Sequence, residues 1–276
     1  SALGLREHAL VAIGGGKDSL VSIEALRDAG VAQTVSWIGG SQLIRACAER
    51  TGLPTLNIQR QLAPELFEYN REGAWNGHIP VTAINSAIMV LAALLVDADQ
   101  VVFSNERSAS YGSLIPGTGE VNHQWSKGWA FETAFGDHVQ ARVAADLHYY
   151  SLLRPLSELA VARQFAKTDR YDAHFSSCNR NFHLLGERPV NRWCGICPKC
   201  HFVYLALAPF GGNLEGVRAA SIAYFGKEPR RLSLAEAALL VALPQSPETR
   251  RPDRFPAAAK AARDRVLARA ASAGLI

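Results

Sequence analysis

The chain has 276 residues, of which 48% are hydrophobic and 20% charged, so it has ample material for one large folded domain or two small ones. Its net charge of +4 is uneven: residues 211–276 hold 11 Lys and Arg against 6 Asp and Glu, and residues 1–210 hold 18 against 19, so bulk charge excludes a nucleic-acid surface on the front part. The longest apolar run, residues 88–96, is too short to span a bilayer and no signal peptide is visible, so we expect a cytoplasmic protein.

The first predicted elements are a strand, a glycine turn and a helix. Residues 10–13 are apolar, as in a buried strand, and residues 14–16 are three glycines that allow a tight turn. A helix then runs from Lys17 to a stop at Gly30. The N–H groups and the dipole of such a helix point at the turn, where a phosphate can bind. We therefore predict a phosphate site here, against the alternative of a glycine turn that binds nothing.

Strands and helices continue to alternate after this unit. Residues 34–38 predict a second strand, Ser41 is a suitable cap for the next helix, and residues 53–58 predict a third strand. This alternation favours an α/β fold with a parallel sheet, in which ligands bind beyond the carboxyl ends of the strands. Residues 14–19 and 37–41 should therefore lie on the same rim.

A polar segment follows the fourth predicted strand. Thr82 is a suitable cap for an apolar helix over residues 83–95, and residues 100–104 form the strand. Residues 105–111 are dense in polar and charged side chains at the carboxyl end of that strand, which predicts a substrate site, with a solvated loop as the alternative. Another helical segment is expected over residues 154–168.

The middle of the chain allows two interpretations. Lys127 and Glu132 could meet a nucleotide or a carboxylate, or they could be ordinary surface residues. The histidines do not follow any metal-ligand spacing, so no metal is assigned to them. These histidines are His78, His123, His138 and His148.

Four of the five cysteines predict a metal site near residue 200. Three of them form a C-x-x-C-x-x-C pattern, and a fourth lies upstream of it. Four thiolates on short turns suit a tetrahedral zinc ion, while an iron–sulfur cluster or redox chemistry would use the same ligand type. His201 is the expected substitute ligand, and the fifth cysteine, Cys47, is expected in the core. The four predicted ligands are Cys178, Cys194, Cys197 and Cys200.

The glycine stretch resembles the PP-loop of ATP pyrophosphatases, written roughly S-G-G-x-D-S, with Gly14 where many members have Ser. This resemblance implies a parallel twisted sheet of the PP-loop, or adenine nucleotide α-hydrolase, type. It also implies that ATP is split between its α and β phosphates, so that AMP is left on an oxygen of the substrate. The residues that would then bind ATP are Gly14, Gly15, Gly16, Lys17, Asp18 and Ser19.

Three separated motifs resemble one family of that superfamily. They are Gly-Gly-Gly-Lys-Asp-Ser at 14–19, Ser-Asn-Glu-Arg-Ser-Ala at 104–109, and Asn-Arg-Trp-Cys-Gly-Ile-Cys-Pro-Lys-Cys-His-Phe-Val-Tyr at 191–204. Over about residues 5–210 the chain looks like the UDP-N-acetyl-α-D-muramoyl-L-alanyl-L-glutamate epimerases, whose members begin well upstream of residue 1. A PP-loop with a four-cysteine knuckle also resembles the 7-cyano-7-deazaguanine synthases, which supply a second enzyme interpretation.

The epimerase resemblance implies an ATP-dependent isomerase of peptidoglycan precursor synthesis. Its substrate would be UDP-MurNAc-L-Ala-L-Glu, whose terminal glutamate is inverted after its carboxylate is adenylated. On this basis Lys17 neutralises phosphate charge, Asp18 holds Mg²⁺ or orders the loop, and Glu106 and Arg107 contact the substrate. Glu106, His78 and Lys127 are possible acids and bases by their chemistry.

From about residue 208 the sequence changes character, which predicts domains at 1–207 and 208–276. Residues 209–247 resemble the later part of the glycosyltransferase domain of class A penicillin-binding proteins of type 1C. Ser233 is a suitable cap for a helix over residues 234–243, and a last amphipathic helix is expected over residues 256–271.

The tail raises a third interpretation of the whole chain. The catalytic glutamates of the glycosyltransferase family lie in motifs that we do not find here, so we predict no glycosyl transfer. The tail is expected to be mobile or loosely docked. The chain could then be a catalytically inactive, zinc-stapled chimera that binds nucleotide without turnover.

Overall fold

The structure is a computed structural model that describes residues 1–74, 79–182, 189, 192–195, 197–207, 210, 225–227, 231–242 and 255–272. The chain divides into two compact units, residues 1–165 and 166–276. The predicted domain boundary at residues 207 and 208 rests on the change of resemblance and stays a prediction.

The first unit is an α/β fold built on a five-stranded parallel sheet, as predicted. The strand order is β3-β2-β1-β4-β7, and every neighbouring pair is parallel. At the centre of the sheet, Val11 pairs with Val35 on one side and with Val102 on the other, and the register between β1 and β4 shifts between Arg6 and Ala9. The strands are β1 (Arg6–Ala12), β2 (Gln33–Ile38), β3 (Thr55–Ile58), β4 (Ala98–Phe103) and β7 (His148–Ser151).

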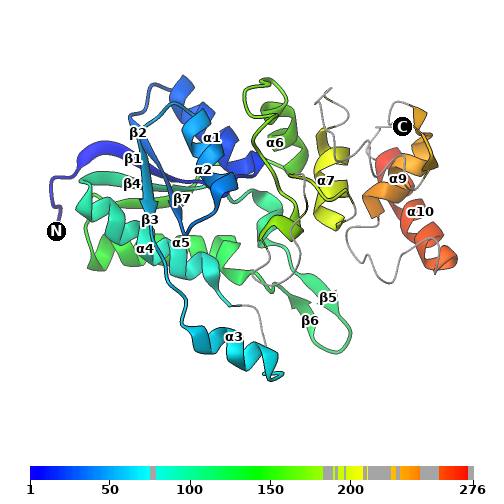
Figure 1. Ribbon diagram of the computed structural model, residues 1–276, viewed down its shortest axis with the longest axis horizontal. Coiled ribbons are helices and arrows are strands. Elements are labelled where there is room, and N and C mark those ends of the chain that lie inside the picture. The colour runs from blue at the N-terminus through cyan, green and yellow to red at the C-terminus, as the bar shows by residue number, and fades with distance from the viewer. Residues whose placement is uncertain are drawn as a thin grey trace. The chain divides into compact units, whose positions relative to one another are not determined.

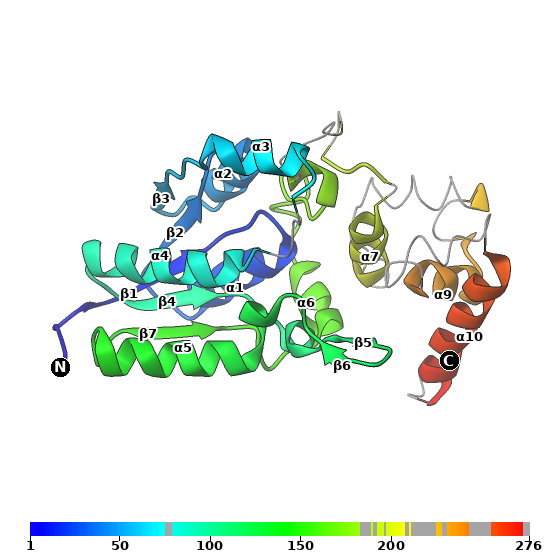
Figure 2. The ribbon, with the colours of Figure 1, turned by 90° about the horizontal axis from the view of Figure 1, so that it is seen from below.

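Helices cover both faces of this sheet. α1 and α2 lie on one face, and α4 and α5 lie on the other (Figures 1 and 2). α6 packs against α1. The helices are α1 (Lys17–Asp28), α2 (Gln42–Arg50), α3 (Pro64–Arg71), α4 (Val81–Leu95), α5 (Trp129–Arg142) and α6 (Glu158–Phe165).

The core forms where these helices meet the sheet. On the α4 and α5 face, Leu10, Met89, Val101 and Leu147 are buried in one cluster. Such side chains contribute most of the favourable free energy of folding, at about 25 cal/mol per Å² of apolar surface buried. The predicted apolar helix and the predicted strands β1 and β4 therefore build this core together with α5 and β7, which contribute Val139 and Tyr149.

Two local expectations have different outcomes. Ser41 caps α2 as predicted, because its side chain accepts a hydrogen bond from the Ile44 N–H at 3.4 Å. The prediction that Thr82 caps the next helix is wrong. α4 already begins at Val81 after Pro80, which stands at the N-cap without a side-chain cap bond, so Thr82 lies within the first turn.

Several elements were not anticipated. The segment between residues 112 and 150 contains a short antiparallel hairpin and then α5 and β7. Two 3-10 turns also occur around it. These additional elements are η1 (Arg107–Ser110), β5 (Ser113–Ile115), β6 (Gly119–Val121) and η2 (Trp125–Lys127).

In the second unit, the described elements are helical. α7 contacts α9, and α9 packs against α10. Ser233 caps α9 as predicted, accepting a hydrogen bond from the Glu236 N–H at 3.3 Å while the Glu236 carboxylate accepts one from the Ser233 N–H at 2.7 Å. Among the described helices of the chain, none combines the length and apolar character needed to cross a membrane. The elements are η3 (Asn179–Phe182), α7 (Pro198–Leu207), α9 (Leu234–Ala242) and α10 (Pro256–Ser272).

Candidate functional site

The glycine turn between β1 and α1 has the geometry of a tight anion-binding loop. Gly15 has a φ of +77°, and a Cβ atom there would lie 2.9 Å from Leu43 Cδ2. A side chain at this position would therefore be both strained and crowded. Gly16 is the N-cap of α1 and makes no side-chain capping bond, so the first N–H groups of the helix are available to an anion.

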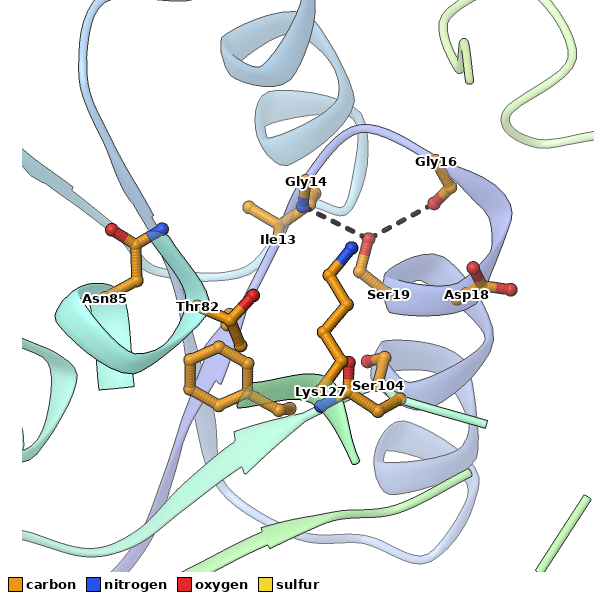
Figure 3. A pocket seen from close by; sticks show the side chains of 12 residues that line it. Ile13, Gly14, Gly16, Asp18, Ser19, Thr82, Asn85, Ser104 and Lys127 are labelled. Carbon is orange, nitrogen blue, oxygen red and sulfur yellow. Dashed lines mark hydrogen bonds between the residues drawn. The ribbon is translucent and has the colours of Figure 1, made fainter. Parts of the chain in front are cut away.

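Ser19 stabilises the turn from the first turn of α1. Its hydroxyl accepts a hydrogen bond from the Gly14 N–H at 3.4 Å and donates one to the Gly16 carbonyl at 3.1 Å (Figure 3). The serine thus links the two ends of the glycine run.

A cavity of about 310 Å³ opens beside this turn. Its walls come from the end of β1, the end of β4, the first turns of α1 and α4, and η2. β1 and β4 are neighbours in the sheet, and the chain leaves them toward opposite faces (Figures 1 and 2). The cavity therefore lies at the topological switch point of the sheet, where open α/β folds bind their ligands.

Lys127 supplies a cation to this cavity. It lies at the end of η2, and its side chain extends toward Gly14 and Ser19 (Figure 3). From the sequence, Lys127 could be either a ligand contact or an ordinary surface residue. In the structure it is part of the cavity wall. Thr82 and Asn85 of α4 form the opposite wall, and neither is among the site residues predicted from the sequence.

Lys17, which the resemblance suggests for neutralising phosphate charge, is buried next to the glycine turn. Its side chain is 2% exposed, and its ammonium contacts Asp18 Oδ1 at 2.6 Å and also Glu158 Oε1. Burial by itself lowers the pKa of Lys17, but the two carboxylates outweigh it and the pKa is raised. Lys17 is therefore a buried cation between two carboxylates, and Asp18 lines the cavity beside it.

The polar segment after β4 is held largely by its own contacts. The buried Glu106 carboxylate accepts hydrogen bonds from the N–H and the hydroxyl of Ser108, at 2.5 and 2.6 Å. Arg107 is exposed and donates to the Pro155 carbonyl at 2.5 Å. The cavity wall includes Ser104 and Asn105 of this segment, whereas Glu106 and Arg107 lie just beyond it. His78, the other suggested acid or base, falls outside the described residues.

In the second unit, the four predicted cysteines come together. Their sulfur atoms all lie within 4.8 Å of one another. The Cys197 sulfur is 3.4 Å from that of Cys200 and 4.0 Å from that of Cys178, and the sulfurs of Cys194 and Cys200 are 3.8 Å apart. Tetrahedral zinc with bonds of about 2.3 Å places its sulfurs about 3.8 Å apart, so the donor set fits a metal ion.

Two thiols of this cluster, Cys197 and Cys200, are joined by a hydrogen bond. The hydrogen bond between Cys197 and Cys200 lowers the pKa of Cys197 to about 4 and raises the pKa of Cys200. All four cysteines are free of disulfides. His201, the expected substitute ligand, has its Nε2 2.8 Å from the Gly195 carbonyl, so it braces the turn between the ligands.

The comparisons with known proteins identify the family. Residues 1–152 match the family model described as the MurL N-terminal domain. The chain belongs to the MurL family. Residues 174–229 match the MurL C-terminal domain, and residues 202–271 match the transglycosylase family model. The last two matches share residues 202–229, a range that includes the predicted junction at residue 208.

Individual relatives agree with these matches. The chain is 88% identical over 209 residues to the UDP-N-acetyl-alpha-D-muramoyl-L-alanyl-L-glutamate epimerase of Xanthomonas oryzae pv. oryzae (strain MAFF 311018), which covers 76% of this chain and 46% of that protein. It is 49% identical over 201 residues to the protein of the same name from Micromonospora sp. (strain ATCC 39149 / NRRL 15099 / SCC 1413), covering 73% and 44%. The chain thus spans about half the length of these relatives.

The tail has its own relatives. It is 56% identical over 73 residues to penicillin-binding protein 1C of Escherichia coli (strain K12), which covers 26% of this chain and 10% of that protein. This match confirms the type of segment that the sequence predicted for the tail.

Proposed function

We propose that this chain catalyses the ATP-dependent epimerisation of the terminal L-Glu of UDP-MurNAc-L-Ala-L-Glu to D-Glu, in the cytoplasm, during peptidoglycan precursor synthesis. The observation that carries the proposal is the 88% identity over 209 residues to an epimerase of that name. The glycine turn and the adjoining cavity support a nucleotide site of the PP-loop type, because they join a helix N-terminus to a cavity at the switch point of the sheet.

The proposed chemistry begins with activation of the substrate carboxylate. One of its oxygens bonds to the α-phosphorus of ATP, the bond from that phosphorus to the bridging oxygen breaks, and pyrophosphate leaves. The acyl group no longer carries a negative charge, so the neighbouring C–H becomes more acidic. A base removes this proton and the carbon receives a proton on its other face. Water then attacks the acyl carbon, which releases AMP and restores the carboxylate.

The residues around the cavity have distinct roles in this proposal. The N–H groups of the glycine turn bind phosphate, and Ser19 keeps the turn in shape. Asp18 would hold Mg²⁺, whose charge would offset that of the phosphates, because its carboxylate lines the cavity and is partly exposed. Lys17 acts through Asp18, since its ammonium is buried against that carboxylate.

The segment after β4 is proposed to face the substrate. The Arg107 guanidinium is exposed beside the cavity wall and can pair with a carboxylate or phosphate of the substrate. Glu106 fixes the shape of this segment through Ser108. The four cysteines would bind zinc as a structural ion, because all four ligand positions of a tetrahedral site are supplied by thiolates.

The test is to incubate the chain with ATP, Mg²⁺ and UDP-MurNAc-L-Ala-L-Glu, and to measure AMP and the chirality of the glutamate residue in the dipeptide product. We expect AMP formation that requires the dipeptide substrate, together with D-Glu. A reaction without ATP is the control. If a folded, metal-loaded chain forms neither product, the epimerase proposal is wrong for this chain, and the inactive chimera becomes the better description.

A further inference from the structure

Arg154 is the centre of a largely buried hydrogen-bond network that includes the backbone of the cavity residue Lys127. It follows β7 in the chain, and its side chain is 11% exposed. One terminal nitrogen, Nη1, donates to the Glu106 carbonyl at 3.1 Å and to the Ser110 hydroxyl at 3.2 Å. The other, Nη2, donates to the Lys127 carbonyl at 2.9 Å and to Glu132 Oε2 at 2.6 Å. One guanidinium thus joins two segments that are distant in the sequence, residues 106–110 and 127–132, to its own.

Glu132 balances the buried charge of Arg154. Its side chain is 5% exposed, and it lies in the first turn of α5, directly after η2. A guanidinium removed from water needs a carboxylate partner of this kind, and its planar fork allows it to bind that partner and backbone carbonyls together. The contact with Glu132 therefore orients the Arg154 guanidinium, which donates to the backbone carbonyls of Lys127 and Glu106.

The contact to the Lys127 carbonyl matters because of where the Lys127 side chain goes. Lys127 lies at the end of a three-residue 3-10 turn, and its side chain extends into the cavity toward the glycine turn (Figure 3). A lysine on so short a turn has its backbone position set by tertiary contacts. Arg154 supplies such a contact through the Lys127 carbonyl, and Arg154 itself is not among the residues that line the cavity.

We propose that Arg154, with its charge balanced by Glu132, is a positioning residue that holds Lys127 over the glycine turn, where the Lys127 ammonium binds a phosphate group of the nucleotide. This inference rests on the proposed function for the identity of the nucleotide. It assigns Lys127, in place of the buried Lys17, as the cation that meets phosphate in this cavity. Glu106 is held by the same guanidinium, so the segment after β4 and the cation are fixed together.

The experiment measures ATP binding by calorimetry in the presence of Mg²⁺, for the full chain and for Lys127→Met, Arg154→Lys and the double variant. Lysine at position 154 keeps a positive charge beside Glu132 but lacks the fork that reaches two carbonyls. We expect Lys127→Met to weaken ATP binding by about 10- to 100-fold, as for loss of a charged hydrogen bond. Arg154→Lys should weaken it about fivefold or more, and the double variant should bind no more weakly than Lys127→Met alone.

Arg142→Lys is the matched control, because Arg142 is exposed at the far end of α5 and should leave binding unchanged. A general structural role for Arg154 would weaken binding by the same factor with or without Lys127, and that additive result would overturn the inference. So would unchanged binding by Lys127→Met. The readout does not need turnover, so a chain that binds ATP but does not epimerise would contradict the proposed function while the inference is still tested. A folded wild-type chain that does not bind ATP would contradict both.

Discussion

Two lysines near the glycine turn have different environments, an inner one that is buried and an outer one that lines the cavity. Lys17 is buried and contacts two carboxylates, whereas Lys127 reaches the cavity from η2. The Lys17 ammonium contacts the Asp18 carboxylate, whereas the Lys127 side chain lines the cavity in which we propose that a ligand binds. The adjacent motif residues Lys17 and Asp18 can therefore have different roles, since Asp18 lines the cavity and Lys17 is buried.

The inner layer predicts an effect on stability at Glu158. Replacing Glu158 by Ala leaves a buried lysine with one carboxylate partner, so we expect the free energy of unfolding to fall by about 1–3 kcal/mol. Chemical denaturation monitored by circular dichroism measures this change. Glu24→Ala is the matched control, because Glu24 forms a more exposed pair with Arg27 on the same helix and should cost less than about 1 kcal/mol. Equal losses for the two variants would show that the Lys17 pair has no special weight.

Among the secondary-structure elements, the segment before the central strand β1 is hydrogen-bonded to the residue pair that precedes the edge strand β7. The Asp146 carboxylate, just before β7, accepts hydrogen bonds from the N–H groups of Leu3, Gly4 and Leu5, at 2.9, 2.7 and 3.0 Å. β1, the central strand, begins at the next residue, Arg6. The anchor therefore ties the entry of the central strand to the edge strand.

This anchor predicts a pH dependence. The Leu3 N–H, followed by that of Leu5, lowers the pKa of Asp146 to about 2 from an ordinary value of 3.8. Since the folded pKa is the lower one, the stabilisation is fully present above pH 3.8 and is lost as the pH falls toward 2. An NMR titration of the Asp146 carboxyl carbon should show a midpoint near 2 in the folded chain and near 3.8 in urea. A folded-state midpoint near 3.8 would mean that the three hydrogen bonds do not form in solution.

At the scale of the whole molecule, the cysteine cluster and the transglycosylase-like tail belong to one compact unit. α7 begins at Pro198, carries Cys200 and contacts α9, and α9 packs against α10. Buried residues of the tail helices are small or aliphatic, including Ala238, Leu240 and Ala259. The metal site and the tail should therefore depend on each other for their stability.

Removal of the metal tests this dependence. We expect about one metal ion per chain, and we expect a chelator to speed amide hydrogen exchange in α7 and α9 by at least about tenfold while the sheet stays protected. Cys194→Ser should lose most of the bound metal. Cys47→Ser should keep it, because Cys47 is a buried residue of α2 outside the cluster. Unchanged exchange in α9 after metal loss would show that the tail is stable without the site.

The elements that can be predicted from the amino-acid order are those whose signals are local. The alternation of apolar runs and glycine stops predicted four of the five parallel strands, and the cysteine spacing predicted the cluster. The sequence pattern missed α5, because the apolar residues of that helix do not form one stripe and Gly136 interrupts it. In the structure Gly136 allows close packing, since a Cβ there would lie 3.1 Å from the Tyr149 carbonyl oxygen. β7 was missed with it, as a four-residue edge strand carries little periodicity.

The identity of the charged residues that face the cavity depends on contacts between distant segments. Lys17 and Glu158 are 141 residues apart, and Arg154 is 22 residues from Glu132, so no local pattern connects them. Lys17, at the helix start, was expected to reach phosphate but is buried by α6, which packs on α1. Lys127 had no motif around it, yet its side chain reaches the cavity because η2 lies beside the start of α4. Local sequence determines backbone conformation, whereas side-chain environment depends on packing between distant segments.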